Sequence, residues 1–143
     1  MIHEEICTYE VCKLAKEKGF NCKVYNYYQA TKHYCETLRG IELHSVCWRL
    51  ETDDCYNRYN KSSEDVVSAP TQSLLQRWLR EEKGIIIEVF MDDDSNMPLT
   101  YNIHQYKDWN WECVCHHHGN YYAVTNWELC LEDALKYALE NLV

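Results

Sequence analysis

The sequence predicts a two-layer α+β fold in which three helices pack on antiparallel strands. The first observation is that 143 residues include only four glycines and two prolines, which indicates regular elements joined by short connections. The second is a similarity between two segments of the chain. Residues 14–25 and residues 79–90 each read as a charged helix end, a glycine and a strand. The third is the short spacing between the expected strands, which favours antiparallel pairing.

These observations predict one domain over residues 1–143 with a pseudo-repeated order. An αββ subunit spans residues 1–50, a connecting loop spans 51–68, and an αββββα subunit spans 69–143. Neither subunit is large enough to bury its helix alone, so we expect one shared core.

The first subunit begins with a helix over Glu4 to Lys18, where apolar side chains recur at helical spacing. Gly19 follows as the left-handed residue that ends the helix. Asn21 to Tyr28 alternates and is rich in valine and tyrosine, which predicts a strand. Residues 29–40 could be a loop or a short helix. Ile41 to Leu50 reads as the second strand, with mixed polarity on both faces.

The second subunit begins with a helix that starts at Ser68-Ala69-Pro70-Thr71, because proline fits the first helical turn. The apolar stripe of this helix consists of Leu74, Leu75, Trp78 and Leu79. Gly84 is expected to end this helix as Gly19 ends the first one. Ile85 to Met91 is a β-branched run and the strongest strand in the chain.

Three more strands and a helix are expected after this run. Leu99 to Tyr106 follows a polar turn, Trp109 to His118 comes next, and Gly119-Asn120 makes a tight turn to Tyr121 to Val124. A capping signal then marks the start of the final helix, whose apolar residues are expected to share one face. The capping residues are Thr125, Asn126 and Glu128, and the apolar residues are Trp127, Leu131, Ala134, Leu135, Ala138 and Leu142.

The net charge of −9 is uneven, because residues 69–143 hold five basic and 12 acidic side chains. Such a surface repels phosphate backbones, so we expect no direct nucleic-acid binding. A basic partner surface would suit it better. No apolar run reaches the ~20 residues of a membrane span, and the acidic N-terminus is unlike a signal peptide, which predicts a cytoplasmic protein without membrane contact.

Nine cysteines, an odd number without an export signal, predict reduced thiols that are mostly structural. The run from Cys113 to His118 holds five potential zinc ligands. On a regular strand Cys113, Cys115 and His117 share one face, and these three are the candidate metal residues. The same face continues upstream to Trp109 and Trp111, so burial of the thiols is the simpler interpretation.

No catalytic constellation is found in the sequence. His44 or His104 could act as a base beside a cysteine, but nothing in the sequence brings them together. The acidic turn from Asp92 to Asn96 lacks the glycine and the distal glutamate of an EF-hand, so a solvated turn is favoured. No phosphate loop or nucleophile elbow is present. We therefore expect a protein that is not an enzyme and carries no cofactor, with zinc as the alternative.

Tyrosines crowd the first half, and tryptophans and tyrosines crowd one expected hairpin. The hairpin aromatics are Trp109, Trp111, Tyr121 and Tyr122. Such side chains suit both a packed sheet and a partner-binding face, because each combines a large apolar body with a polar tip.

The segment from Ser68 to Glu81, with the sequence Ser-Ala-Pro-Thr-Gln-Ser-Leu-Leu-Gln-Arg-Trp-Leu-Arg-Glu, resembles short proteins encoded by phages and prophages of Bacteroidales gut bacteria. The helix end from Leu14 to Phe20 and the acidic helix from Leu131 to Glu140 are similar to theirs in the same order. The resemblance implies a phage or prophage origin and brings no activity or catalytic residue.

The leading hypothesis is a small accessory protein that acts in the host cytoplasm by binding a host protein. One alternative is a zinc module built on the Cys113 to His118 run. Another is a sponge for a small signalling molecule, which requires an apolar pocket with convergent polar groups. The oligomeric state stays open, a homodimer included.

Overall fold

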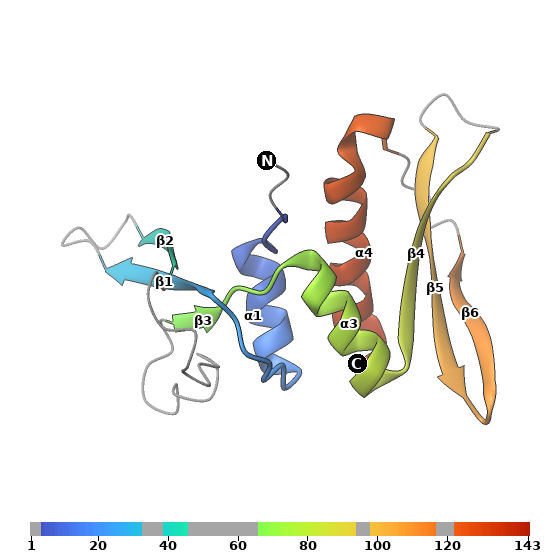
Figure 1. Cartoon of the computed structure of the whole chain (residues 1–143), viewed down its shortest axis with the longest axis horizontal. Coiled ribbons are helices and arrows are strands. Elements are labelled where there is room, and N and C mark those ends of the chain that lie inside the picture. Colours follow the sequence, from blue (N-terminus) through green and yellow to red (C-terminus); the bar gives the residue numbers. More distant parts are fainter. Residues whose placement is uncertain (1–3, 33–38, 46–65, 94–97, 117–121) are drawn as a thin grey trace. The chain divides into compact units, whose positions relative to one another are not determined.

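The structure is a computed structural model that describes residues 4–32, 39–45, 66–93, 98–116 and 122–143. Within these residues it contains three α-helices and two three-stranded antiparallel sheets (Figure 1). The predicted α+β class with antiparallel strands is confirmed. The chain divides into two compact units, one of residues 6–71 and the other of residues 1–5 and 72–143. The boundary therefore falls at the start of the second helix, and the stretch expected as a connecting loop does not separate the units.

The first unit opens with helix α1 (Tyr9–Glu17), so the predicted start at Glu4 is wrong by five residues. The Thr8 hydroxyl accepts a hydrogen bond from the Val11 N–H at 3.4 Å. At the other end Gly19 has a φ of 89°, and its N–H donates to the Lys16 carbonyl. The Phe20 N–H donates to the Ala15 carbonyl at 2.9 Å, which completes a Schellman cap. The predicted glycine stop is confirmed.

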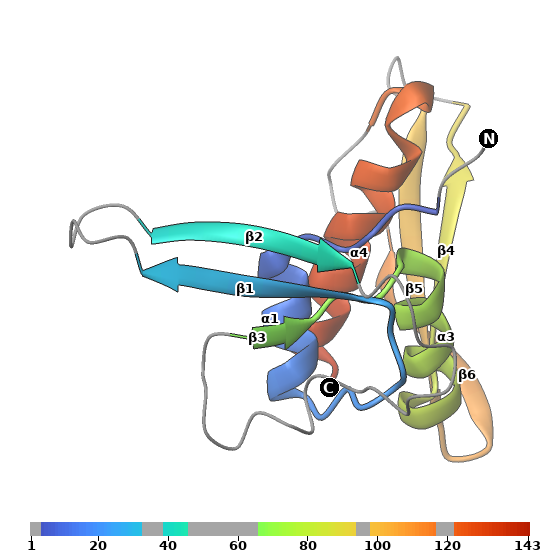
Figure 2. The same ribbon diagram turned by 60° about the vertical axis from the view of Figure 1, so that its left-hand side comes forward.

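The sheet of the first unit has the order β2-β1-β3. Strand β1 (Asn26–Lys32) pairs with β2 (Arg39–Ser45) on one side and with β3 (Val66–Ser68) on the other (Figure 2). The prediction that residues 51–68 are only a connection is wrong at its end, because residues 66–68 form the third strand. A three-residue strand has too short a pattern to stand out in sequence, and it forms here because β1 supplies its hydrogen-bonding partner. The structure also begins β1 five residues later than predicted, and the predicted end of the next strand after Ser45 lies outside the described residues.

The second unit carries helix α3 (Gln72–Lys83), then β4 (Ile85–Met91), β5 (Leu99–Lys107) and β6 (Asn110–His116). Its sheet has the order β4-β5-β6, with β4 and β6 at the edges. Gly84 joins α3 to β4 with a φ of 64°, and its carbonyl accepts a hydrogen bond from the Tyr106 N–H at 2.8 Å. Helices α3 and α4 contact β4, and α4 also contacts β5 (Figure 1).

The predicted fourth strand at Tyr121 to Val124 is wrong. Tyr122 makes an isolated bridge, exchanging both backbone hydrogen bonds with Leu99 of β5, and residues 124–126 form the short 3-10 helix η1 (Val124–Asn126). Tyr122 therefore extends the row of β5 partners and does not begin a new strand. The predicted turn at Gly119-Asn120 lies outside the described residues.

The last helix, α4 (Trp127–Asn141), begins where the sequence predicts, but the Asn126 side chain makes no capping hydrogen bond. Its apolar face packs on the sheet side that carries Leu99, Tyr101 and Ile103, all at most 1% exposed. The buried residues of this helix include Cys130, Leu131, Ala134, Leu135, Ala138 and Leu139. A buried polar pair ties α4 to α3, since Gln72 Nε2 donates to Glu132 Oε2 at 2.9 Å.

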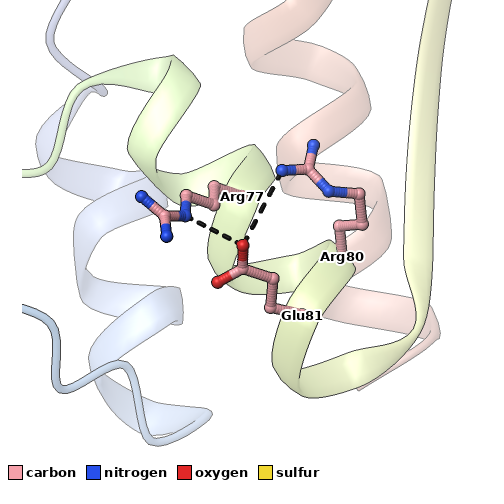
Figure 3. A network of polar contacts seen from close by, with 3 residues as sticks. All are labelled: Arg77, Arg80 and Glu81. Atoms are coloured by element: carbon pink, nitrogen blue, oxygen red, sulfur yellow. Dashed lines mark hydrogen bonds and ion pairs between the residues drawn. The ribbon is translucent and has the colours of Figure 1, made fainter.

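The solvent side of α3 carries a small charge network (Figure 3). The Arg77 guanidinium donates to Glu81 Oε1 at 2.9 Å, and Arg80 approaches the same oxygen at 3.9 Å. All three side chains are at least half exposed, so the network contributes little stability. It does neutralise Glu81 locally.

Candidate functional site

The turn between β5 and β6 places a tryptophan at its tip. Lys107 and Asn110 are register partners, so Asp108 and Trp109 form a two-residue turn between them. Both residues have positive φ, 49° and 67°, as a type I′ turn requires. The Trp109 side chain is 92% exposed. The sequence placed Trp109 in a strand, and that prediction is wrong because the favoured Asn-Gly or Asp-Gly turn signal is missing here.

Two further aromatic rings lie next to this turn. Tyr106 and Trp111 face each other across β5 and β6, with their ring centroids 5.2 Å apart. They are 43% and 44% exposed. With Trp109 they form an exposed cluster of three aromatic side chains within six residues, which we call the aromatic hairpin. The sequence predicted four aromatic residues in a hairpin. Trp109 and Trp111 belong to the aromatic hairpin, Tyr122 is buried, and Tyr121 lies outside the described residues.

Cys113 and Cys115 lie on opposite faces of the sheet, so the prediction that they share a face is wrong. His104 pairs with Cys113 while the preceding Ile103 pairs with Cys115, so Val114 is the extra residue of a β-bulge. Cys115 is 6% exposed on the core side with Ile103, whereas Cys113 is exposed. The third candidate metal residue, His117, lies outside the described residues.

The buried thiols of this unit, Cys115 and Cys130, both have a raised pKa. Burial raises the pKa of the Cys115 thiol, and a hydrogen bond with Tyr137 opposes this only in part. Burial and the Asp133 charge raise the pKa of Cys130 to about 11, so this thiol is neutral and weakly nucleophilic. In the described part of the chain no three histidine, cysteine or acidic side chains are grouped as metal ligands. The zinc site at Cys113, Cys115 and His117 stays a prediction.

Of the six cysteines that the structure describes, four are buried. The buried ones are Cys7, Cys12, Cys115 and Cys130. This distribution agrees with the interpretation of structural thiols, while Cys35, Cys47 and Cys55 lie outside the described residues.

His104 stands beside an acidic residue on the outer sheet face. Its Nε2 lies 3.3 Å from Glu88 Oε2, diagonally across β4 and β5. Cys113 is the register partner of His104, but its Sγ lies 3.5 Å from the Cys115 carbonyl oxygen as a weak donor. His44 pairs with Tyr27 in the other unit. Of the two histidines considered as bases, His104 therefore has a cysteine as its register partner, whereas His44 has a tyrosine.

An open hollow of about 560 Å³ borders the β4 edge of the same sheet. Residues from α3, β4, β5 and α4 line it: Gln76, Ile86, Ile87, Glu88, Val89, His104, Trp127 and Leu131. Its walls are mainly apolar, and Trp127 is 46% exposed. The polar side-chain groups of its described lining are the Gln76 amide, the Glu88 carboxylate, the His104 imidazole near that carboxylate and the indole N–H of Trp127. Nothing in the sequence pattern indicated this hollow, because it is assembled from four separate elements.

The comparisons with known proteins add no relationship. No protein family model, curated protein or solved structure matches the chain. Among the residues that the structure describes, no helix is both long and apolar enough to cross a bilayer.

Proposed function

We propose that this protein is a small phage- or prophage-type accessory protein that works without catalysis, in the host cytoplasm, by binding a host protein through the aromatic hairpin. The observation that carries the proposal is Trp109, which is 92% exposed and held at a φ of 67°. A bulky residue with positive φ is a genuine outlier. Glycine would occupy this turn position without that strain.

Exposure and strain at one residue favour a role in recognition over a role in folding. The Trp109 side chain contributes little buried area to its own fold, and strained backbone positions cluster at functional sites. Tryptophan and tyrosine are also the residues that most often dominate binding energy at protein interfaces. Tyr106 and Trp111 extend the apolar surface beside Trp109, so a partner would bury three rings together.

The charge of the surrounding chain supports a partner with a basic surface. Residues 69–143 carry a net charge of −7, and Asp108 lies next to Trp109 in the turn. Opposite charges around an apolar centre raise association rates and select against acidic partners. Binding should therefore weaken as the salt concentration rises.

Two glycine substitutions in the same turn test the proposal. Trp109→Gly removes the indole ring, while Asp108→Gly relaxes the neighbouring positive φ and keeps the ring. We expect the wild type and Asp108→Gly to retain one stoichiometric partner from host lysate at low salt, and Trp109→Gly to lose it. Equal retention by all three baits, or no partner for any of them, would contradict the proposal.

A further inference from the structure

We propose that the free edge of β4 accepts an extended segment of a partner protein as a fourth strand, and that this segment alternates apolar and basic side chains. This inference concerns a second surface and does not depend on the aromatic hairpin. It starts from the hollow beside β4, which four consecutive residues of that strand help to line. Because successive side chains of a strand point to opposite faces, a hollow lined by all four runs along the strand edge.

The backbone of β4 has hydrogen-bonding groups available at that edge. The Tyr106 N–H bonds the Gly84 carbonyl, and the Asp92 N–H bonds the Pro98 carbonyl. Hydrogen-bonded pairs alternate along an antiparallel ladder, so the even-numbered residues of β4 are bonded to β5. Ile87 and Val89 therefore direct their N–H and C=O groups away from β5, and no described residue pairs with them there.

The two edges of this sheet are built differently. The β6 edge carries the Val114 bulge, a device that discourages pairing with another strand. The register of β4 with β5 is unbroken over seven residues, and the strand contains neither lysine nor proline. Four of its apolar side chains, Ile86, Ile87, Val89 and Phe90, are half-buried. A long regular edge of this kind is a template for strand addition.

The two faces of an added strand would meet different surfaces. Side chains on the helix side would enter the hollow against Val89, Trp127 and Leu131, which favours apolar residues. Side chains on the other face would pass Glu88, which is 57% exposed and is the only carboxylate among the described residues that line the hollow. Cross-strand pairs of opposite charge are stabilising, so a lysine or arginine fits that position.

Charge argues against a second copy of this chain as the occupant. Glu88 is the middle residue of β4, so a symmetric antiparallel pairing centred there would set Glu88 against its own copy. Like charges directly opposite each other are destabilising. Each chain also carries a net charge of −9, whereas a basic segment would be attracted.

The probe is a labelled synthetic peptide as long as β4 that alternates valine with lysine, compared with one that alternates valine with glutamate. We expect the lysine peptide to bind by fluorescence anisotropy and to protect the Ile87 and Val89 amides from hydrogen exchange. Glu88→Lys should weaken it about fivefold or more and transfer the preference to the glutamate peptide. Glu112→Lys changes the net charge equally on exposed β6 and should leave the preference unchanged.

Val89→Pro removes an outward N–H without removing a bond to β5, and it should abolish peptide binding. Trp109→Gly should leave binding intact, which separates this site from the aromatic hairpin. Equal effects of Glu88→Lys and Glu112→Lys would overturn the proposal, as would peptide binding without amide protection. Dimers that bury the β4 amides would assign the edge to a second copy. Failure of the lysine peptide to bind to a folded wild type would also overturn it.

Discussion

Cys113 and Cys115 lie on opposite faces of one sheet although a single residue separates them. Regular alternation would put both on the same face, and the extra residue Val114 reverses the direction of one of them. One thiol is therefore open to reagents, and the other packs on the core side with Ile103.

This arrangement predicts a large difference in thiol reactivity. In the native protein at neutral pH we expect iodoacetamide to modify Cys113 quickly and Cys115 and Cys130 slowly, because both buried thiols have a raised pKa. Raising the pH toward 11 should increase the rate at Cys130, whose pKa is about 11. Peptide mapping by mass spectrometry measures each site, and urea provides the control in which all react. Equal rates at Cys113 and Cys115 in the native state would contradict the bulge.

The same arrangement makes a prediction about zinc. We expect Cys113→Ser and Cys115→Ser not to lower bound zinc in parallel, because thiols on opposite faces cannot ligate one ion without a change of register. Elemental analysis of protein purified without a histidine tag measures the metal content. A parallel loss in the two variants would instead support the site predicted at Cys113, Cys115 and His117.

Glycine substitutions in the turn at Asp108 and Trp109 should stabilise the protein. Glycine at either position removes the penalty of positive φ, about 1 to 2 kcal/mol, but loses about 0.5 to 1 kcal/mol through greater freedom of the unfolded chain. We therefore expect Asp108→Gly and Trp109→Gly each to raise the free energy of unfolding by about 0.5 kcal/mol. Urea denaturation measures it. A loss of stability in Trp109→Gly would mean that the indole ring packs on the fold.

Gly19 and Gly84 occupy corresponding places in the two similar segments, but they should differ in their tolerance of alanine. Both have positive φ, so either substitution is strained, by about 1 to 2 kcal/mol. A Cβ at Gly84 would also lie 3.3 Å from the Tyr106 Cβ, whereas a Cβ at Gly19 meets nothing within 4 Å. Gly84→Ala should therefore lower the free energy of unfolding more than Gly19→Ala. The reverse order in urea denaturation would refute this account.

Alkaline pH should destabilise the second unit. Burial raises the pKa of Tyr101, and burial together with the hydrogen bond to Asp133 raises the pKa of Tyr122. Burial and the charge of Asp133 raise the pKa of the Cys130 thiol from 9.0 to about 11. A group with a raised pKa in the folded state keeps its proton there while the unfolded chain loses it, so stability falls as the pH rises above about 9.

The size of the alkaline effect can be assigned to single residues. For Cys130 the loss by pH 11 is on the order of 2 kcal/mol, since one pKa unit corresponds to about 1.4 kcal/mol. Cys130→Ala and Tyr122→Phe should each flatten the fall of the unfolding free energy between pH 9 and 11. An unchanged slope in both variants would show that these buried groups do not control it.

Local chemistry made several elements predictable. The Schellman cap at Gly19, the strand after Gly84 and the start of α4 depend on neighbouring residues along the chain, so they can be read from it. The type I′ turn was missed because Asp-Trp carries no glycine signal. Strand β3 was missed because three residues are too few to show a period, and because its pairing partner β1 lies far away in sequence.

The sequence alone determined the α+β class, the glycine stop of α1, the start of α4 and the excess of acidic side chains, because propensity, capping and charge act over a few residues. Only the tertiary structure decided where the reactive and exposed groups lie. The Val114 bulge separated the two thiols, the turn brought Trp109 to the surface, and four distant segments built the hollow beside β4. Each of these depends on strand register and edge position, which arise from pairing between segments and leave no periodic pattern within either one.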